Sequence, residues 1–494
     1  MKDTLLKGAL ALLFGAALHT NALAKDTLTL GMTLEPPALD PTSGAAAAID
    51  EVLYANVFEG LTRIDAEGQV QAGLAEKWSV SEDGLRWVFT LRPGVTFHDG
   101  STFDAADAVF SLDRARGPDS KNAQKGLFEA ISAVKAVDPQ TVEITLSRPE
   151  GAFAWNLGWG DAVMLAPESA DSNATKPIGT GPFRFDSRVE GQSITLTRNA
   201  DYWGKPVALS KVVFRFIADP AAQVAALKAG DLDAFPSIGA YESVADFANS
   251  SDFKVVVGTT EGETLLVPNQ RKAPWNDPRV RQALTHAIDR KALVTAVSEG
   301  YGTPIGSHFA PHSPAYVDLT GLYAYDPDRA KELLAAAGVA PGSKAVMKLP
   351  PPAYARRGGE VIAAYLAQVG IEVEIVPVEW GQWLSDVFKG AHDFDLTIVS
   401  HTEPLDIGIY ARKDYYFGYE STAFDAVMDE IKRTADPARR NALYGQAQDI
   451  LAKDAANVFL YQLPKLGVWK KGLEGLWANS PIQANDLTQA HWVQ

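Results

Sequence analysis

Short runs of β-branched and aromatic residues alternate with amphipathic segments along the whole chain. Runs rich in Val, Ile, Thr and aromatic side chains predict strands. They are Thr27 to Met32, Trp87 to Leu91, Val142 to Leu146, Ile194 to Arg198, Val212 to Ile217, Val373 to Val378, Leu396 to Val399 and Val458 to Tyr461. Because these runs alternate with helical segments and no repeat of fixed period is present, the pattern predicts an α/β or mixed architecture.

Helix starts are marked by a recurring Asp-Pro pair. The pairs are Asp219-Pro220, Asp277-Pro278, Asp326-Pro327 and Asp436-Pro437. An Asp carboxylate can accept the unpaired N–H groups of a first turn, and Pro suits the first helical position. Gly230 and Gly338 follow two of these segments, so we expect them to take the left-handed conformation at the helix ends. These signals predict helix boundaries and say nothing about activity.

The first 24 residues differ in kind from the rest. Lys2 and Lys7 precede an apolar run that ends at Leu18, and Ala22 and Ala24 supply small residues at the positions that signal peptidase reads. The pattern predicts a cleavable signal peptide over residues 1–24 and therefore an exported protein. The alternative is an N-terminal membrane anchor, but the run is shorter than the roughly 20 residues that span a bilayer.

Composition narrows the function classes. The chain has 494 residues, 46% of them hydrophobic, a formal charge of −16 and no cysteine. Without a thiol there is no Cys-ligated zinc, iron–sulfur cluster, thiolate nucleophile or lipid-modified cysteine, so we do not expect a lipoprotein. The net acidity argues against a nucleic-acid partner.

Motifs for common catalytic sites are missing. No Gly-Lys pair is followed by Ser or Thr as a phosphate-binding loop requires, and no Gly-x-Ser-x-Gly elbow is present. None of the eight histidines lies in a His-Glu-x-x-His pattern, and Pro311 and Pro314 break any helix that would present His308 and His312 to one metal. We therefore predict no catalytic residues, no metal site and no cofactor. A secreted hydrolase stays as the alternative of a different class, because paired carboxylates are recognised by their separation in space.

An ordered series of blocks resembles one family. The blocks are Leu74 to Gly84, Trp87 to Gly100, Phe103 to Ser111, Ile178 to Phe183, Asn199 to Trp203, Ala226 to Asp233, Asp277 to Leu284, Ala287 to Arg290 and Tyr325 to Leu334. They resemble the family 5 extracellular solute-binding proteins, which are the dipeptide- and oligopeptide-binding subunits of bacterial ABC importers. The resemblance extends from about Thr27 to the C-terminus.

The resemblance implies a fold. It is the two-lobe periplasmic-binding-protein fold of type II, large and cluster C-like, with an extra subdomain in lobe 1. By similarity lobe 1 is residues 25–263, with the inserted subdomain at about 65–180. Lobe 2 would be residues 264–469, and residues 470–494 would return to lobe 1.

The resemblance also implies a function. The chain would be a periplasmic solute-binding protein, without catalysis, that captures a short peptide or a small amine-bearing solute by lobe closure. It would deliver the solute to an ABC permease with ATPase subunits, and we expect a monomer. Ligands left open are an opine, a sugar and a metal chelate; for a nickel or haem carrier, His401 could be a ligand.

Two regions are implied to hold the solute. In peptide-binding members the segment after the first strand lines the cleft, so the backbone of Thr42, Ser43, Gly44 and Ala45 could pair with an extended ligand; a surface loop is the alternative. In lobe 2, relatives that bind dipeptides keep an Asp for the α-amino group, and here His401, Glu403 and Asp406 surround that position. We favour Glu403 and Asp406 for this role, with solvated loop acids as the alternative for either one.

Two further observations qualify the expected ligand. The position of the Arg that clamps the dipeptide carboxylate falls near Leu349 or Pro350, which puts dipeptide specificity in doubt. Trp380, Trp383 and Tyr410 lie in an aromatic-rich segment that could stack on a ligand, with core packing as the alternative.

Overall fold

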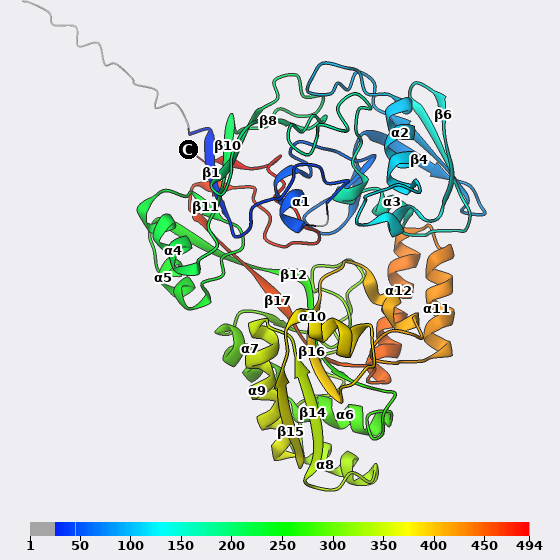
Figure 1. The fold of residues 1–494 in the computed structure, drawn as a ribbon, viewed down its shortest axis with the longest axis vertical. Helices are drawn as coiled ribbons and strands as arrows, with labels where there is room; N and C mark the ends of the chain where they lie inside the picture. The colour runs from blue at the N-terminus through cyan, green and yellow to red at the C-terminus, as the bar shows by residue number, and fades with distance from the viewer. Residues whose placement is uncertain (1–24, 45, 494) are drawn as a thin grey trace, which may run out of the picture.

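The structure is a computed structural model that describes residues 25–44 and 46–493. The predicted signal peptide and Ala45 lie outside the described residues. Figure 1 shows an upper body, which contains β1 to β11 and the C-terminal segment, and a lower body, which contains α6 to α12. Two long strands, β12 (Phe253–Pro268) and β17 (Val458–Lys470), cross between them. We call this antiparallel pair the ribbon; its register shifts between Thr259 and Glu263, which leaves Thr260 to Gly262 outside the regular ladder.

One mixed sheet runs through both bodies. Its order is β15-β14-β16-β12-β17-β11-β1-β10-β9-β8. Besides the ribbon it contains β1 (Thr27–Met32), β8 (Phe183–Val189), β9 (Ser193–Arg198), β10 (Lys211–Phe216), β11 (Ala234–Phe235), β14 (Ser343–Leu349), β15 (Ile371–Pro377) and β16 (Leu396–His401), and β13 (Thr303–Pro304) pairs with β17. Parallel pairs, such as β1 with β10 and β14 with β15, occur beside antiparallel ones. The predicted α/β class is confirmed.

Helices cover the sheet in both bodies. They are α1 (Ala47–Leu53), α2 (Ala105–Arg116), α3 (Phe153–Asn156), α4 (Pro220–Ala229), α5 (Val244–Ala248), α6 (Pro278–Ala287), α7 (Arg290–Ser298), α8 (Pro327–Ala336), α9 (Ala353–Gln368), α10 (Trp380–Trp383), α11 (Thr422–Arg433) and α12 (Pro437–Lys453). All four helices predicted from Asp-Pro pairs are present, and each Asp accepts a hydrogen bond from an N–H group of its first turn. Gly230 and Gly338 have positive φ, as predicted.

A second sheet forms a separate unit of the upper body. It has the order β4-β5-β7-β6, with β4 (Ala75–Val80), β5 (Arg86–Leu91), β6 (Ile131–Asp138) and β7 (Thr141–Leu146), and it follows the short hairpin of β2 (Thr62–Ile64) and β3 (Val70–Ala72). Trp87, Phe89 and Phe153 belong to the buried cluster under this sheet. The unit therefore has a hydrophobic core of its own, packed against α2.

The two bodies also touch away from the ribbon. The N–H of Gly151 donates to the carbonyl of Lys432 at 2.7 Å, and Arg440 donates to the carbonyl of Gly151. Figure 1 shows α11 and α12 below α3 at this contact. A Cβ atom at position 151 would overlap the carbonyl oxygen of Thr434, so only glycine allows this approach.

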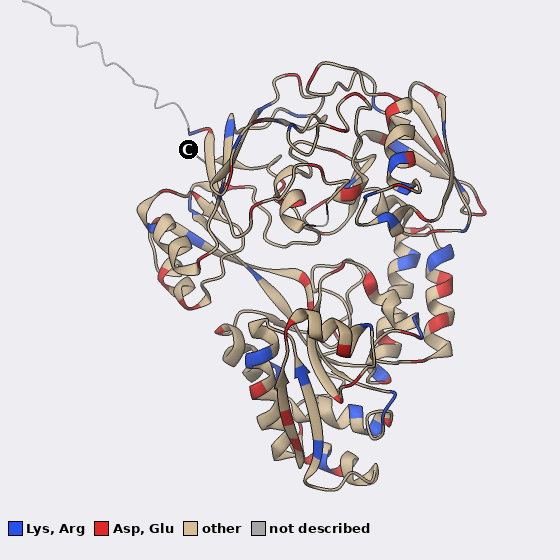
Figure 2. Ribbon diagram, in the orientation of Figure 1, with Lys and Arg blue, Asp and Glu red and all other residues tan. Residues whose placement is uncertain are grey.

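The C-terminal segment returns to the upper body. Within it β18 (Leu473–Glu474) pairs with β19 (His491–Trp492), and the indole of Trp492 donates to the carbonyl of Thr27 at 2.9 Å. Figure 2 shows acidic and basic residues interspersed over both bodies. Among the described residues, no helix combines the length and apolar character that crossing a bilayer would require.

Candidate ligand-binding site

A cavity of about 480 Å³ lies between the two bodies. We call it the central cavity. The upper body contributes Met32 to Leu34 at the end of β1, Phe235 to Ser237 at β11 and residues of the C-terminal segment. The ribbon contributes Thr260 to Gly262 and Leu463 to Lys465, and the lower body contributes Thr402 and Pro404. The irregular part of the ribbon therefore faces the cavity directly. A volume of this size suits a small ligand.

A buried lysine forms part of the cavity wall. Lys465 lies on β17, is 3% exposed, and donates to the carbonyls of Trp477 at 3.0 Å and Asn479 at 3.1 Å. Burial lowers the pKa of Lys465 to about 8, although the charge of Glu51 opposes the shift. An ammonium group has three donors, so two carbonyl partners leave one donor for a ligand.

Carboxylates lie on the same wall. Glu51 of α1 and Glu261 of the ribbon both line the central cavity. Burial raises the pKa of Glu51, against the charge of Lys465, and burial also raises the pKa of Glu261. The cavity thus presents one cationic and two acidic groups whose charged forms are poorly solvated, and a ligand of opposite charge would stabilise each of them.

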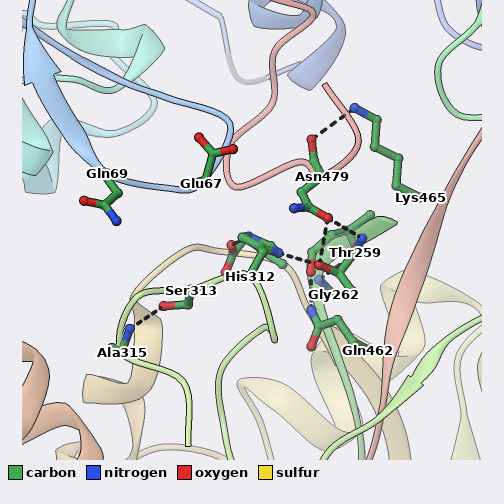
Figure 3. A network of polar contacts seen from close by, with 12 residues as sticks. Glu67, Gln69, Thr259, Gly262, His312, Ser313, Ala315, Gln462, Lys465 and Asn479 are labelled. Atoms are coloured by element: carbon green, nitrogen blue, oxygen red, sulfur yellow. Dashed lines mark hydrogen bonds and ion pairs between the residues drawn. The ribbon is translucent and has the colours of Figure 1, made fainter. Parts of the chain in front are cut away.

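Glu261 also borders a second cavity of about 190 Å³, which Pro404 shares. His312 lines this second cavity and joins two residues of the ribbon: its Nε2 is 2.6 Å from the carboxylate of Glu261, and its Nδ1 is 2.6 Å from the hydroxyl of Thr259. Figure 3 shows His312 pointing towards Thr259 and Lys465 pointing towards Asn479.

The structure brings together the three polar residues predicted in the lower body, since His401, Glu403 and Asp406 each have a ligand atom within 4.8 Å of the other two. His401 ends β16, and its Nδ1 is 3.4 Å from the carboxylate of Asp406, which also bonds to His308 Nε2 at 2.6 Å. Burial alone would raise the pKa of Asp406, but the imidazoles of His308 and His401 hold it well below its usual range. Each oxygen of Asp406 is thus paired with a histidine.

Glu403 lies nearer the cavity. It is exposed, and it lies between Thr402 and Pro404, which line the cavity. Among the described residues, its carboxylate accepts one long hydrogen bond, at 3.3 Å, from the N–H of Thr402. The side chain of Glu403 is therefore available for other partners.

The aromatic residues divide between core and surface. Trp383 is 3% exposed and donates to the hydroxyl of Thr397, and Tyr410 is 1% exposed and accepts a hydrogen bond from Asn457. Both belong to the hydrophobic core of the lower body. Trp380 is 42% exposed, with its ring packed edge-on against Trp383.

The segment Thr42 to Gly44 folds into a turn away from the lining of either cavity. Asp40 accepts hydrogen bonds from the backbone N–H groups of Thr42 at 2.9 Å and Ser43 at 3.2 Å, the second through its carbonyl. Arg114 donates to the hydroxyl of Thr42 at 2.5 Å. These N–H groups have partners within the turn; Ala45, which completes the predicted segment, lies outside the described residues.

Sequence reasoning missed Lys465, Glu51 and Glu261. Lys465 and Glu261 carried a usable signal, because each is a charged residue inside a long, largely apolar strand, where charges are rare unless they have a partner. Glu51 carried none, since an acid in a helix normally lies on the solvent face.

Comparisons with known proteins give one consistent answer. The family described as bacterial extracellular solute-binding proteins, family 5 Middle, matches residues 69–406. The glutathione-binding protein GsiB of Salmonella typhi is 29% identical over 478 residues, which cover 92% of this chain and 93% of GsiB.

Two solved structures extend the likeness to the fold. HbpA2 from Haemophilus parasuis has a TM-score of 0.85 at 25% identity, covering 95% of this chain and 100% of HbpA2. The ABC transporter-associated periplasmic binding protein DppA from Helicobacter pylori, in complex with the peptide STSA, has a TM-score of 0.74 at 26% identity, covering 95% and 99%. The two-lobe type II fold predicted from the sequence is confirmed.

Proposed function

Because the chain belongs to the family 5 bacterial extracellular solute-binding proteins, we propose that it holds a short peptide, or another small solute with an amine and a carboxylate, in the central cavity. The observation that carries this ligand class is the presence of Lys465, Glu51 and Glu261 on the wall of one cavity between the two bodies. The protein binds this solute, returns it unchanged and passes it to an ABC permease with its ATPase subunits.

The carboxylate of the solute binds to Lys465. Lys465 is 3% exposed, and its ammonium keeps one donor beyond its two carbonyl partners. A hydrogen bond between an ammonium and a carboxylate in a dry site is a charge-assisted contact, about twice as strong as a neutral one. This pairing raises the proton affinity of Lys465 back towards its ordinary value.

The amine of the solute meets the acidic side of the cavity. Glu51 and Glu261 line it, and Glu403 lies between two lining residues. Asp406 has both oxygens bonded to histidines, so we assign the direct amine contact to Glu403 and let Asp406 hold His401 in place behind it. Among the aromatic residues, Trp380 is exposed enough to contact the solute, while Trp383 and Tyr410 support the wall from the core.

Lobe closure follows from the ribbon. We propose that residues 25–263 and 470–494 form one lobe, with a subdomain at about 65–180, and that residues 264–469 form the other. Rotation about the irregular residues Thr260 to Gly262 then changes the distance between Glu51 of the first lobe and Glu403 of the second without breaking either core. Residues 1–24 direct export to the periplasm, where a monomer acts.

The first test identifies the solute. The full chain is produced in its periplasm, purified without a denaturing step, and denatured for mass spectrometry of what is released. A peptide or amino acid conjugate in stoichiometric amount supports the proposal. A neutral sugar in its place contradicts the role of Lys465 and the acids, and conversion of an added peptide into products contradicts binding without catalysis.

The second test uses calorimetry with one peptide in three forms: free, N-acetylated and C-amidated. Lys465→Met should weaken the free peptide about 10- to 100-fold, the scale of a hydrogen bond to a charged group, and leave the C-amidated form unchanged. Lys254→Met is the matched control, because Lys254 lies on the ribbon outside the cavity and pairs with Glu474. Unchanged affinity of Lys465→Met for the free peptide, or an equal loss for the free and the C-amidated forms, would contradict the proposal.

A further inference from the structure

A group of metal-ligating side chains, two of them buried, includes Glu263, which directly follows the cavity-lining residue Gly262. The carboxylate of Glu263, the imidazole of His308 and the carboxylate of Asp406 each bring one ligand atom within 4.8 Å of the other two. They come from the ribbon, the segment after β13 and the loop after β16. We propose that this triad binds a divalent first-row transition ion, Zn²⁺ being the probe of choice, as a resident ion of the lower body.

An unpartnered oxygen points to a missing cation. Glu263 is 1% exposed, and its Oε2 has no hydrogen-bond partner among the described residues. Buried carboxylate oxygens are almost always hydrogen-bonded or bound to a cation, because the desolvation cost is otherwise uncompensated. The charged groups that act most strongly on Glu263 are Asp406, Glu261 and Glu403, all of them acidic.

The charge balance fits a divalent ion. Two carboxylates with one neutral imidazole carry a charge of −2, which a divalent cation cancels. Imidazole nitrogen together with carboxylate oxygen is a ligand set that suits zinc and its neighbours better than Ca²⁺ or Mg²⁺, which prefer oxygen alone. No cysteine is needed for such a site.

The residues around the triad hold its ligands in position. The other ring nitrogen of His308 is 3.4 Å from the hydroxyl of Tyr410, which also accepts a hydrogen bond from Asn457 at 3.0 Å. The second oxygen of Asp406 is 3.4 Å from His401, whose Nε2 is 3.1 Å from the hydroxyl of Tyr416. Such outer partners fix the tautomer and orientation of metal ligands, so His401 is a positioning residue here.

A second triad offers a built-in comparison. His401, Glu403 and Asp406 also bring ligand atoms within 4.8 Å, but Glu403 is exposed. We assign the ion to the inner triad because Glu263 is buried and His308 is completely buried, at 0% exposure, while an exposed carboxylate is satisfied by water. Glu403→Gln is therefore the matched control for Glu263→Gln.

The test uses the full chain, stripped of metal with a chelator, dialysed and titrated with Zn²⁺ alone by calorimetry. The bound ion is counted by atomic emission. We expect one equivalent in the unmodified chain and in Glu403→Gln, and an affinity reduced more than about 10-fold in Glu263→Gln. Co²⁺ in place of Zn²⁺ should give visible absorption bands that Glu263→Gln removes.

The choice of Glu263→Gln keeps the test independent of folding. The substitution keeps the size of the side chain and replaces a buried acid with a neutral amide, so this variant is expected to fold even if a substitution of His308 does not.

Three outcomes overturn the proposal: no zinc in the folded, unmodified chain, unchanged affinity in Glu263→Gln, or loss of zinc in Glu403→Gln with retention in Glu263→Gln. The same preparations are titrated with the peptides used for the central cavity. Peptide binding without zinc binding overturns the metal site alone, and zinc binding without peptide binding overturns only the proposed solute.

Discussion

Two histidines that lie four residues apart in the sequence, His308 and His312, each pair with a distant carboxylate and behave differently. His308 pairs with Asp406 and His312 pairs with Glu261, each at 2.6 Å. Both ring nitrogens of His312 have partners, since the second nitrogen bonds to Thr259, and its partner Glu261 borders both cavities. His308 belongs to a larger group with an unpaired oxygen. Its partner Asp406 also pairs with His401, and Oε2 of the neighbouring Glu263 has no hydrogen-bond partner among the described residues.

The difference shows that pair geometry alone does not define a function. The same distance between the same chemical groups gives a contact between ribbon and lower body in one case and a candidate ion site in the other. The surroundings decide: a hydroxyl and a cavity satisfy the first pair, while beside the second pair the buried Oε2 of Glu263 has no hydrogen-bond partner among the described residues.

The largest effect on stability is expected from His308→Leu. The substitution removes the closest partner of Asp406 and leaves a buried charge with weaker compensation, which should lower the free energy of unfolding by about 3–5 kcal/mol. Urea unfolding in the presence of a chelator measures it, so that metal release does not contribute. A loss below about 1 kcal/mol would mean that the two pairs are equivalent after all.

The next effect concerns how poorly water solvates Lys465 on the wall of the central cavity, compared with the buried residues around Asp406. The pKa of Lys465 is lowered to about 8, with Glu51 as the charged group that faces it. Above that pH the unfolded chain binds the extra proton, so stability should rise between about pH 8 and pH 10.5, by up to roughly 3 kcal/mol. Unfolding followed at several pH values should show this slope in the unmodified chain and lose it in Lys465→Met; equal slopes would place Lys465 in a wet environment.

A smaller loss is expected from His312→Leu. Glu261 is 8% exposed and borders two cavities, so water can replace the lost imidazole. We expect a loss of about 1 kcal/mol in unfolding free energy and unchanged zinc binding. A loss as large as that of His308→Leu would show that the pair of His312 and Glu261 is as poorly solvated as the pair of His308 and Asp406.

The smallest effect on stability is expected from Glu403→Gln, within about 0.5 kcal/mol, because the residue is exposed. Its effect on binding is separate: an amine-bearing ligand should bind about 1.5–3 kcal/mol more weakly. Calorimetry with a free and an N-acetylated peptide measures the difference. Unchanged affinity for the free peptide would remove Glu403 from the amine contact.

Local signals in the sequence predicted much of the fold. The Asp-Pro pair at Asp436 fixes the start of α12 through a bond within one helical turn, and such bonds depend only on neighbouring residues. The strands were also predicted from local signals, because runs of β-branched residues are typical of half-buried strands. β17 shows the limit, because the predicted run ends at Tyr461 whereas the strand continues to Lys470 and includes the cavity lysine.

The candidate site could be predicted only in part, because it is assembled from distant segments. Glu263, His308 and Asp406 are far apart in the chain, and no spacing rule connects them. His401 and Asp406 were predicted as one region, and the structure places them in contact. The sequence could not tell which aromatic residues are buried and which are exposed. Trp380 and Trp383 have similar sequence neighbours, and they differ in which side of the short helix α10 packs against the core.

The contact at Gly151 affects the residence time of a bound solute and not the specificity of the cavity. The contact that Gly151 makes with Lys432 and Arg440 joins the two bodies through backbone carbonyl and amide groups, away from the residues that line the central cavity. Any rotation about the ribbon that opens this side must break that contact, whatever the cavity holds. Exchange of Gly151 for a larger residue would act as a wedge that shortens the residence time of every solute equally, so release can be tuned without altering recognition.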